Sequence, residues 1–133
     1  AVTYVAPVEG RIVGFATVAR SSIERASVPS AALRARLPSY PLPVLRLARL
    51  GVDLRAQRLG IGKALLRRVL GLALEQRDRL GCVGVVTDAK PDAVRFYETL
   101  GFAALEGVRE GLLVSEPQPL FLGLGTIAAA LEE

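Results

Sequence analysis

The amino-acid sequence predicts an α/β domain with a mixed sheet flanked by helices. Two apolar, strand-like runs, 44–52 and 82–87, stand on either side of a long helical pattern that covers roughly 60–80. A strand, helix and strand of this kind form a right-handed crossover between two parallel strands. The flanking segments are typical of hairpins, so antiparallel strands are expected beside the parallel pair. The length of 133 residues fits one domain, 1–133.

The N-terminal third is expected to form a hairpin followed by a long connection. Residues 2–6 and 12–19 have the composition of strands, and the proline and glycine in 7–11 are typical of the turn between them. Residues 21–40 contain scattered prolines and arginines, which indicates a connection rather than a further strand. Its middle, 30–37, is expected to form a short helix.

The second half of the chain is expected to contain one more helix and the remaining strands. Gly81 stands where a C-cap glycine ends a helix, and Gly101 closes the next helix. Pro91 suits the first turn of that helix. The expected elements are a strand over 82–87, a loop over 88–90, a helix over 92–100, and strands over 102–105 and 120–127.

The chain contains no histidine, which excludes Ser-His-Asp and Cys-His catalysis and argues against a catalytic zinc site. No metal ligands are therefore predicted. The single cysteine, Cys82, lies in an apolar run and is expected to be a buried, inert thiol. One cysteine fits a reducing compartment, and the predicted location is the cytoplasm. No apolar run is long enough to span a bilayer.

The chain is basic, with a net charge of +4 and a pI near 9.8. This balance suits a polyanionic partner, such as RNA or a nucleotide cofactor. The alternative is a solvated, mildly basic surface.

The turn that opens the long helix is predicted to bind a phosphate. Free backbone N–H groups at a helix N-terminus attract an anion, and glycines allow a phosphate to approach the backbone closely. The pattern is neither a dinucleotide-binding fingerprint nor a P-loop. The alternative is a tight turn whose glycines serve packing. The candidate residues are Gln57, Arg58, Leu59, Gly60, Ile61, Gly62, Lys63 and Ala64.

Two motifs in this chain resemble those of the GNAT superfamily of N-acetyltransferases. Gln57-x-x-Gly60-x-Gly62 is similar to its pyrophosphate-binding pattern, and about 35 residues later the run Phe96-Tyr97-Glu98-Thr99-Leu100-Gly101-Phe102 is similar to a second motif. The resemblance implies a GNAT-like sheet and acetyl-CoA as the cofactor.

Finer matches resemble one branch, the acetyltransferase toxins of bacterial toxin–antitoxin modules. They are the strand 43–53, the dipeptide Asp88-Ala89 before the Phe-Tyr helix, and the segment 120–127. This resemblance implies acetyl transfer to the α-amine of aminoacyl-tRNA, with a small DNA-binding antitoxin as a partner and a homodimer as a further option. No membrane partner is expected.

The sequence departs from the family pattern in two places. Arg58 stands where the family usually has glycine, so it either contacts a phosphate of CoA or is exposed. The superfamily also places a strand and one or two helices before the hairpin at 2–19. We therefore expect this chain to lack that N-terminal segment.

The resemblance also implies catalytic roles. Tyr97 is expected to be the general acid that protonates the departing thiolate. Backbone groups of Leu50, Gly51 and Val52 are expected to pair with the pantetheine arm and to donate to the thioester oxygen. The alternative for Tyr97 is simple packing, like that of the neighbouring Phe96.

The long connection is expected to contribute to acceptor binding. Arg34 and Arg36, on the long connection, are expected to contact tRNA phosphates; the alternative is a solvated loop face. An α-amine, with a pKa of about 7.7–8.0, needs less help to react than a lysine side chain near 10.4. A small amine or a protein N-terminus remains an alternative acceptor, and an inactive CoA- or RNA-binding module is an alternative function.

Overall fold

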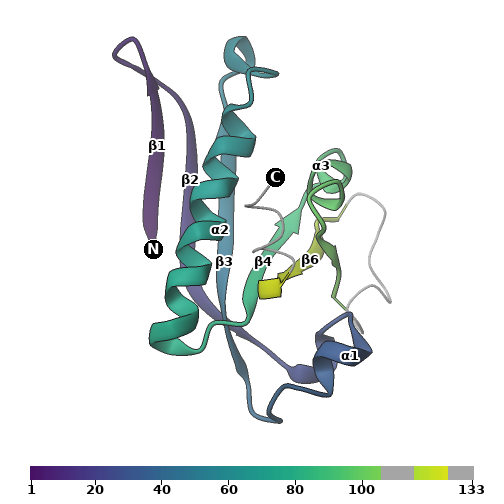
Figure 1. Cartoon of the computed structure of the whole chain (residues 1–133). Coiled ribbons are helices and arrows are strands. Elements are labelled where there is room, and N and C mark those ends of the chain that lie inside the picture. Colours follow the sequence, from purple (N-terminus) through teal and green to yellow (C-terminus); the bar gives the residue numbers. More distant parts are fainter. Residues whose placement is uncertain (106–115, 126–133) are drawn as a thin grey trace.

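The computed structural model describes residues 1–105 and 116–125 and has a mixed sheet as its centre (Figure 1). The strand order is β1-β2-β3-β4-β6-β5, and β3 and β4 are the parallel pair. The strands are β1 (Val2–Val8), β2 (Arg11–Ile23), β3 (Leu42–Val52), β4 (Gly84–Ala89), β5 (Ala103–Ala104) and β6 (Gln118–Gly123). The helices are η1 (Arg25–Ser27), α1 (Ala31–Arg34), η2 (Leu54–Ala56), α2 (Ile61–Leu80) and α3 (Val94–Glu98).

Helix α2 covers one face of the sheet (Figure 1). Its buried residues, Leu65, Leu66, Val69, Leu70 and Ala73, recur three and four positions apart, so they form one apolar stripe. They pack into the larger core cluster together with residues of β2, β3 and β4. Truncating a leucine such as Leu66, which is 1% exposed, would cost roughly 2–5 kcal/mol.

The other face has a smaller core beneath the connection that contains η1 and α1. Val28, Leu33 and Leu37 from this connection pack against Val86 and Phe121 of the sheet. Because side chains alternate along a strand, β4 supplies both cores, one from each face. The connection therefore occupies the face opposite α2, at the end of the sheet where β3 begins.

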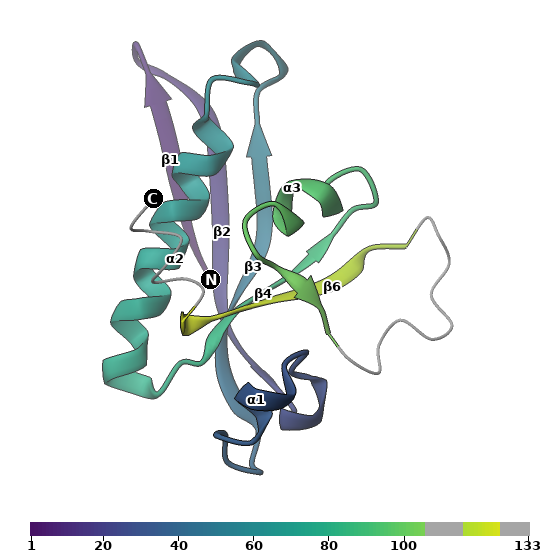
Figure 2. The same ribbon diagram turned by 45° about the vertical axis from the view of Figure 1, so that its right-hand side comes forward.

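Strands β3 and β4 pair over a short distance and then diverge (Figure 2). The parallel register is Leu45↔Val85, Arg46↔Val86 and Leu47↔Thr87. Beyond Leu47, β3 continues to Val52 along β2 alone. The β2–β3 register skips Ala48, which marks a bulge in β3 at this point. A bulge redirects a strand, so the two strands are free to separate here.

The mixed sheet, the parallel pair, the N-terminal hairpin and the short helix are confirmed. The C-cap at Gly81 is also confirmed, with φ 68° and a 3.1 Å bond from its N–H to the Arg77 carbonyl. The loop predicted over 88–90 is wrong, because Asp88 and Ala89 pair with β6 as part of β4.

Other predicted boundaries shift by a few residues. Residues 21–23 continue β2 instead of opening the connection, because they pair with the first residues of β3. The helix predicted over 92–100 is α3, Val94–Glu98, preceded by a turn. The last strand ends at Gly123, and residues 126–127 lie outside the described part of the chain.

Candidate active site

A cavity of about 500 Å³ lies between the end of β3, the start of α2 and α3. It brings together two motifs that are far apart in the sequence, the glycine turn and the Phe-Tyr helix. The lining residues are Leu50, Val52, Gln57, Arg58, Gly60, Ile61, Gly62, Lys63, Asp92, Ala93, Phe96 and Tyr97.

The turn before α2 has an unusual backbone at two positions. Gly60 has φ 81°, in the left-handed region that glycine adopts without strain. Arg58 has φ 72° in the same region, where a side chain carries a steric cost. The position at which the family has glycine therefore keeps a glycine-like backbone although arginine occupies it.

The start of α2 offers backbone donors to the cavity. The first intrahelical bond runs from the Ala64 N–H to the Gly60 carbonyl at 3.0 Å. The Ala64 amide, which was among the predicted phosphate donors, is therefore not free, because it already donates to the Gly60 carbonyl. The amides of Ile61, Gly62 and Lys63 precede it and have no acceptor within the helix.

Gly62 leaves space in the cavity because it has no side chain. A Cβ placed on it would lie 3.6 Å from Val52 and 3.9 Å from Phe96, which is ordinary van der Waals contact. A larger side chain would project between the start of α2 and α3. Glycine at 62 therefore leaves open the space that a ligand on the helix N-terminus would need.

One backbone carbonyl on the edge of β3 that borders the cavity already has a side-chain partner. The Gln57 side-chain amide donates a 3.2 Å hydrogen bond to the Val52 carbonyl, which ties the turn to the strand. Leu50 and Val52 line the cavity, but Gly51 does not. A Cβ on Gly51 would lie 2.6 Å from the Phe15 ring, so this glycine serves a close contact with β2. Leu59 is 74% exposed and also lies outside the lining.

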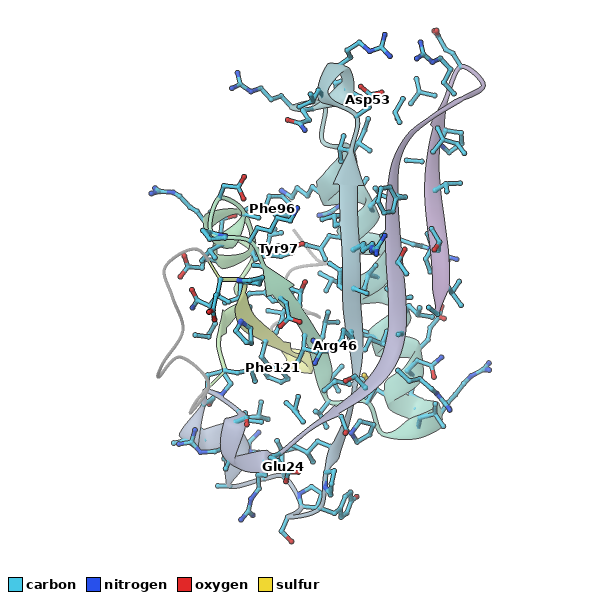
Figure 3. All side chains as sticks on the ribbon, turned by 180° about the vertical axis from the view of Figure 1, so that it is seen from behind. Glu24, Arg46, Asp53, Phe96, Tyr97 and Phe121 are labelled. Atoms are coloured by element: carbon cyan, nitrogen blue, oxygen red, sulfur yellow. The ribbon has the colours of Figure 1, made fainter. Side chains whose placement is uncertain are left out.

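Tyr97 lies at the inner end of the cavity on α3, next to Phe96 (Figure 3). Its ring is 6% exposed and makes edge contacts with Phe96 and Phe102, with centroids 5.2 and 5.3 Å away. Burial raises the pKa of the Tyr97 phenol, and a hydrogen bond with Thr87 opposes the rise. The phenol therefore stays protonated at neutral pH. Tyr97 thus packs against its neighbours and also lines the cavity. A packing role and a role as general acid are therefore compatible.

The predicted RNA-binding arginines lie elsewhere. Arg34 and Arg36 belong to α1 and the residues after it, at the opposite end of the sheet from the glycine turn (Figure 1). The Arg34 guanidinium donates to the Val28 carbonyl, so it holds the connection together. Arg36 is exposed and lines a separate cavity of about 440 Å³. The structure therefore does not bring these two arginines into the first cavity.

Sequence reasoning missed three lining residues, Asp92, Ala93 and Phe96. Asp92 lies in the turn before α3 and Phe96 lies within the helix, so their proximity depends on how this turn folds. Phe96 belongs to the Phe-Tyr motif of the sequence, and this motif was the available signal.

The described residues hold no cluster of three or more His, Cys, Asp or Glu side chains suited to a metal ion. None of the helices in the described ranges is long and apolar enough to cross a membrane.

Comparisons with known proteins identify relatives of this chain. A tRNA-acetylating toxin of Mycobacterium tuberculosis (strain ATCC 25618 / H37Rv) is 36% identical over 95 residues, which are 71% of this chain and 56% of that protein. This chain thus matches little more than half the length of that relative.

Two solved structures have the same fold at 26% identity. AtaT complexed with acetyl-methionyl-tRNAfMet superposes with a TM-score of 0.81, covering 96% of this chain and 73% of that one. AtaTR bound with AcCoA superposes with a TM-score of 0.71, covering 96% and 72%. The model of the acetyltransferase (GNAT) domain family matches residues 1–104. This chain therefore belongs to the GNAT acetyltransferase family.

Proposed function

We propose that this domain transfers the acetyl group of acetyl-CoA to a primary amine, and that the acceptor is the α-amine of aminoacyl-tRNA. The observation that carries the proposal is the cavity that joins the amides of the glycine turn to the buried phenol of Tyr97. The relatives whose names mention tRNA acetylation and acetyl-methionyl-tRNA support the acceptor.

The residues of the cavity fit CoA. The amides of Ile61, Gly62 and Lys63, together with the dipole of the 20-residue helix α2, suit its pyrophosphate. Lys63 and Arg58 add positive charge at the mouth. The edge of β3 beyond Leu47 has no β4 partner and can pair with an extended pantetheine chain.

Tyr97 performs the proton step. When the neutral amine attacks, a carbon–nitrogen bond forms and the carbon–sulfur bond breaks; the nitrogen loses one proton to water, and the thiolate needs one. The buried phenol gives this proton, because burial keeps it protonated at neutral pH. A backbone N–H of β3 near Leu50 and Val52 stabilises the negative charge that develops on the thioester oxygen.

The charge of the protein and its single thiol bear on its macromolecular partners and its cellular location. A basic protein attracts tRNA through its phosphates, and a DNA-binding antitoxin is the expected protein partner. The buried free thiol of Cys82 suits the reducing cytoplasm.

The test is an acetylation assay with labelled acetyl-CoA and four acceptors: charged tRNA, uncharged tRNA, polyamines and peptides. We expect label on charged tRNA, and a KM for it that rises steeply with salt. Arg36→Ala should raise that KM and leave the KM for acetyl-CoA unchanged. Arg79→Ala, which removes an exposed arginine from α2, is the matched control and should change neither. Label on polyamines or peptides with none on charged tRNA would contradict the acceptor and keep the acetyltransferase.

A further inference from the structure

An ion pair lies where β3 and β4 begin to diverge. The Arg46 guanidinium on β3 and the Asp88 carboxylate on β4 are 3.0 Å apart. The Arg46 Nε also donates to the Ser21 hydroxyl of β2 at 3.4 Å. Arg46 lies near the middle of the molecule in the view from behind (Figure 3). Three neighbouring strands therefore contribute to one polar cluster.

This ion pair is on the opposite face of β4 from Tyr97. Thr87 points toward Tyr97, since the two side chains are hydrogen-bonded. Val86 packs into the core on the other face, and Asp88 shares its face because side chains alternate along a strand. Asp88 and Tyr97 therefore flank β4 from its two sides.

Asp88 also marks the edge of the opening between the strands. Leu47↔Thr87 is the last residue pair in the β3–β4 register, so Asp88 is the first residue of β4 beyond it. A thioester that enters from the cavity along the unpaired edge of β3 would have Tyr97 on one side and Asp88 on the other. In acyl transfer the amine adds to one face of the planar thioester carbonyl, so a group that binds the amine must lie apart from the group that protonates the departing sulfur.

The Asp88 carboxylate has room for another partner. Its side chain is 54% exposed and that of Arg46 is 34% exposed, so the pair is open to solvent. Ion pairs this exposed contribute little to stability. A carboxylate accepts several hydrogen bonds, and one held by an arginine is already oriented for an incoming cation.

We propose that Asp88 binds the amino group of the acceptor, and that Arg46 is a positioning residue that holds this carboxylate. The proposal rests on the acetyltransferase function and adds the recognition of its acceptor. It identifies the acceptor as a primary amine that arrives as a cation on the face opposite Tyr97. Asp88 holds the ammonium form in place, and the fraction that has lost its proton to water reacts.

The experiment measures binding without turnover. Affinity is measured for two tRNA analogues with amide-linked termini, one with an α-amine and one with a hydroxyl group in its place. The wild-type protein should bind the amine analogue about tenfold more tightly, as expected for one charged hydrogen bond. Asp88→Asn should bind both alike, and Asp88→Glu should recover part of the preference.

Two further variants separate this role from a structural one. Asp78→Asn breaks the exposed Arg77–Asp78 pair on α2 and should keep the full preference. Arg46→Leu should lose part of the preference, and adding Asp88→Asn should remove only the remainder, because the two residues act as a unit. The affinity for CoA should be the same in all variants.

Equal affinity of the wild-type protein for the two analogues would overturn the amine site, and so would an unchanged preference in Asp88→Asn. A protein that prefers the amine analogue in this way but transfers no acetyl group would support the site and contradict the acetyltransferase function.

Discussion

The Thr87 hydroxyl donates a 3.0 Å hydrogen bond to the Leu47 carbonyl, across the last residue pair of β3 and β4. Thr87 is 4% exposed, and it is also the hydrogen-bond partner of Tyr97. One buried hydroxyl thus connects the point of strand divergence to the proposed general acid. The geometry of the opening and the position of the phenol are therefore coupled.

Thr87→Val tests this coupling. Valine keeps the shape but leaves the buried Leu47 carbonyl without its donor, so the free energy of unfolding should fall by about 1–3 kcal/mol. The turnover number should also fall, while the KM for acetyl-CoA changes little. Chemical denaturation and steady-state kinetics measure both effects. Thr3→Val, which removes an exposed hydrogen bond to Thr17, is the control and should cost less than about 0.5 kcal/mol. Equal costs would show that the buried bond has no special role.

Tyr97→Phe should lower kcat by roughly 10²–10⁴-fold and leave the affinity for acetyl-CoA nearly unchanged. The ring and its contacts with Phe96 and Phe102 remain, so the fold should be retained. Steady-state kinetics and calorimetry on the same sample separate the two effects. A fully active variant would assign Tyr97 to packing alone.

The pH dependence of kcat should have no alkaline fall until above about pH 10, because burial raises the pKa of Tyr97 above its ordinary value of 10.0. On the acidic side, kcat/KM should follow the free acceptor amine, near about 7.7–8.0. A group with a raised folded-state pKa stabilises the fold below the unfolded value, and this contribution is lost as pH rises through the folded value. Stability should thus also decline above about pH 10. A fall of kcat near neutral pH that Tyr97→Phe abolishes would contradict this assignment.

Arg58→Gly should separate stability from binding. It removes the steric cost of a left-handed arginine, about 1–2 kcal/mol, and adds the backbone entropy of glycine, about 0.5–1 kcal/mol. The free energy of unfolding should therefore rise, by up to about 1.5 kcal/mol, while the affinity for CoA falls with the lost charge. Arg55→Gly is the control, since Arg55 lies in η2 without a positive φ, and it should lower stability. A lower free energy of unfolding in Arg58→Gly would refute the claim that the left-handed backbone at Arg58 is strained.

Much of the fold could be predicted because local signals and tertiary structure agree. The periodicity of 61–80 and the glycine at 81 specify α2 and its end, and the two apolar strands around it require a parallel crossover. Asp88 and Ala89 were predicted as a loop because an aspartate before a proline-containing segment is typical of turns. Pairing with β6 holds them in the sheet instead, and this long-range contact leaves no local signal.

The candidate site was predictable in part for the same reason. The turn residues follow from glycine positions in the sequence, and most of them line the cavity. The placement of Arg34 depends on where the connection packs, and the sequence does not encode this locally. Arg46 and Asp88 are 42 residues apart in the chain, so their ion pair can be recognised only once the sheet register is known.

The most direct test of the central claim is the affinity of acetyl-CoA for two glycine variants of the same helix. Gly62→Glu places a negative side chain in the cavity, where a Cβ already reaches van der Waals contact with Val52 and Phe96. Gly71→Glu adds the same group where a Cβ meets nothing within 4 Å. Helix propensity favours both substitutions, so both proteins should fold.

Isothermal titration calorimetry with acetyl-CoA should give an affinity at least about tenfold weaker for Gly62→Glu, which corresponds to about 1.4 kcal/mol. The Gly71→Glu variant should bind acetyl-CoA as the wild-type protein does. Equal affinities for the wild-type protein and a folded Gly62→Glu variant would contradict the claim that acetyl-CoA binds at the start of α2.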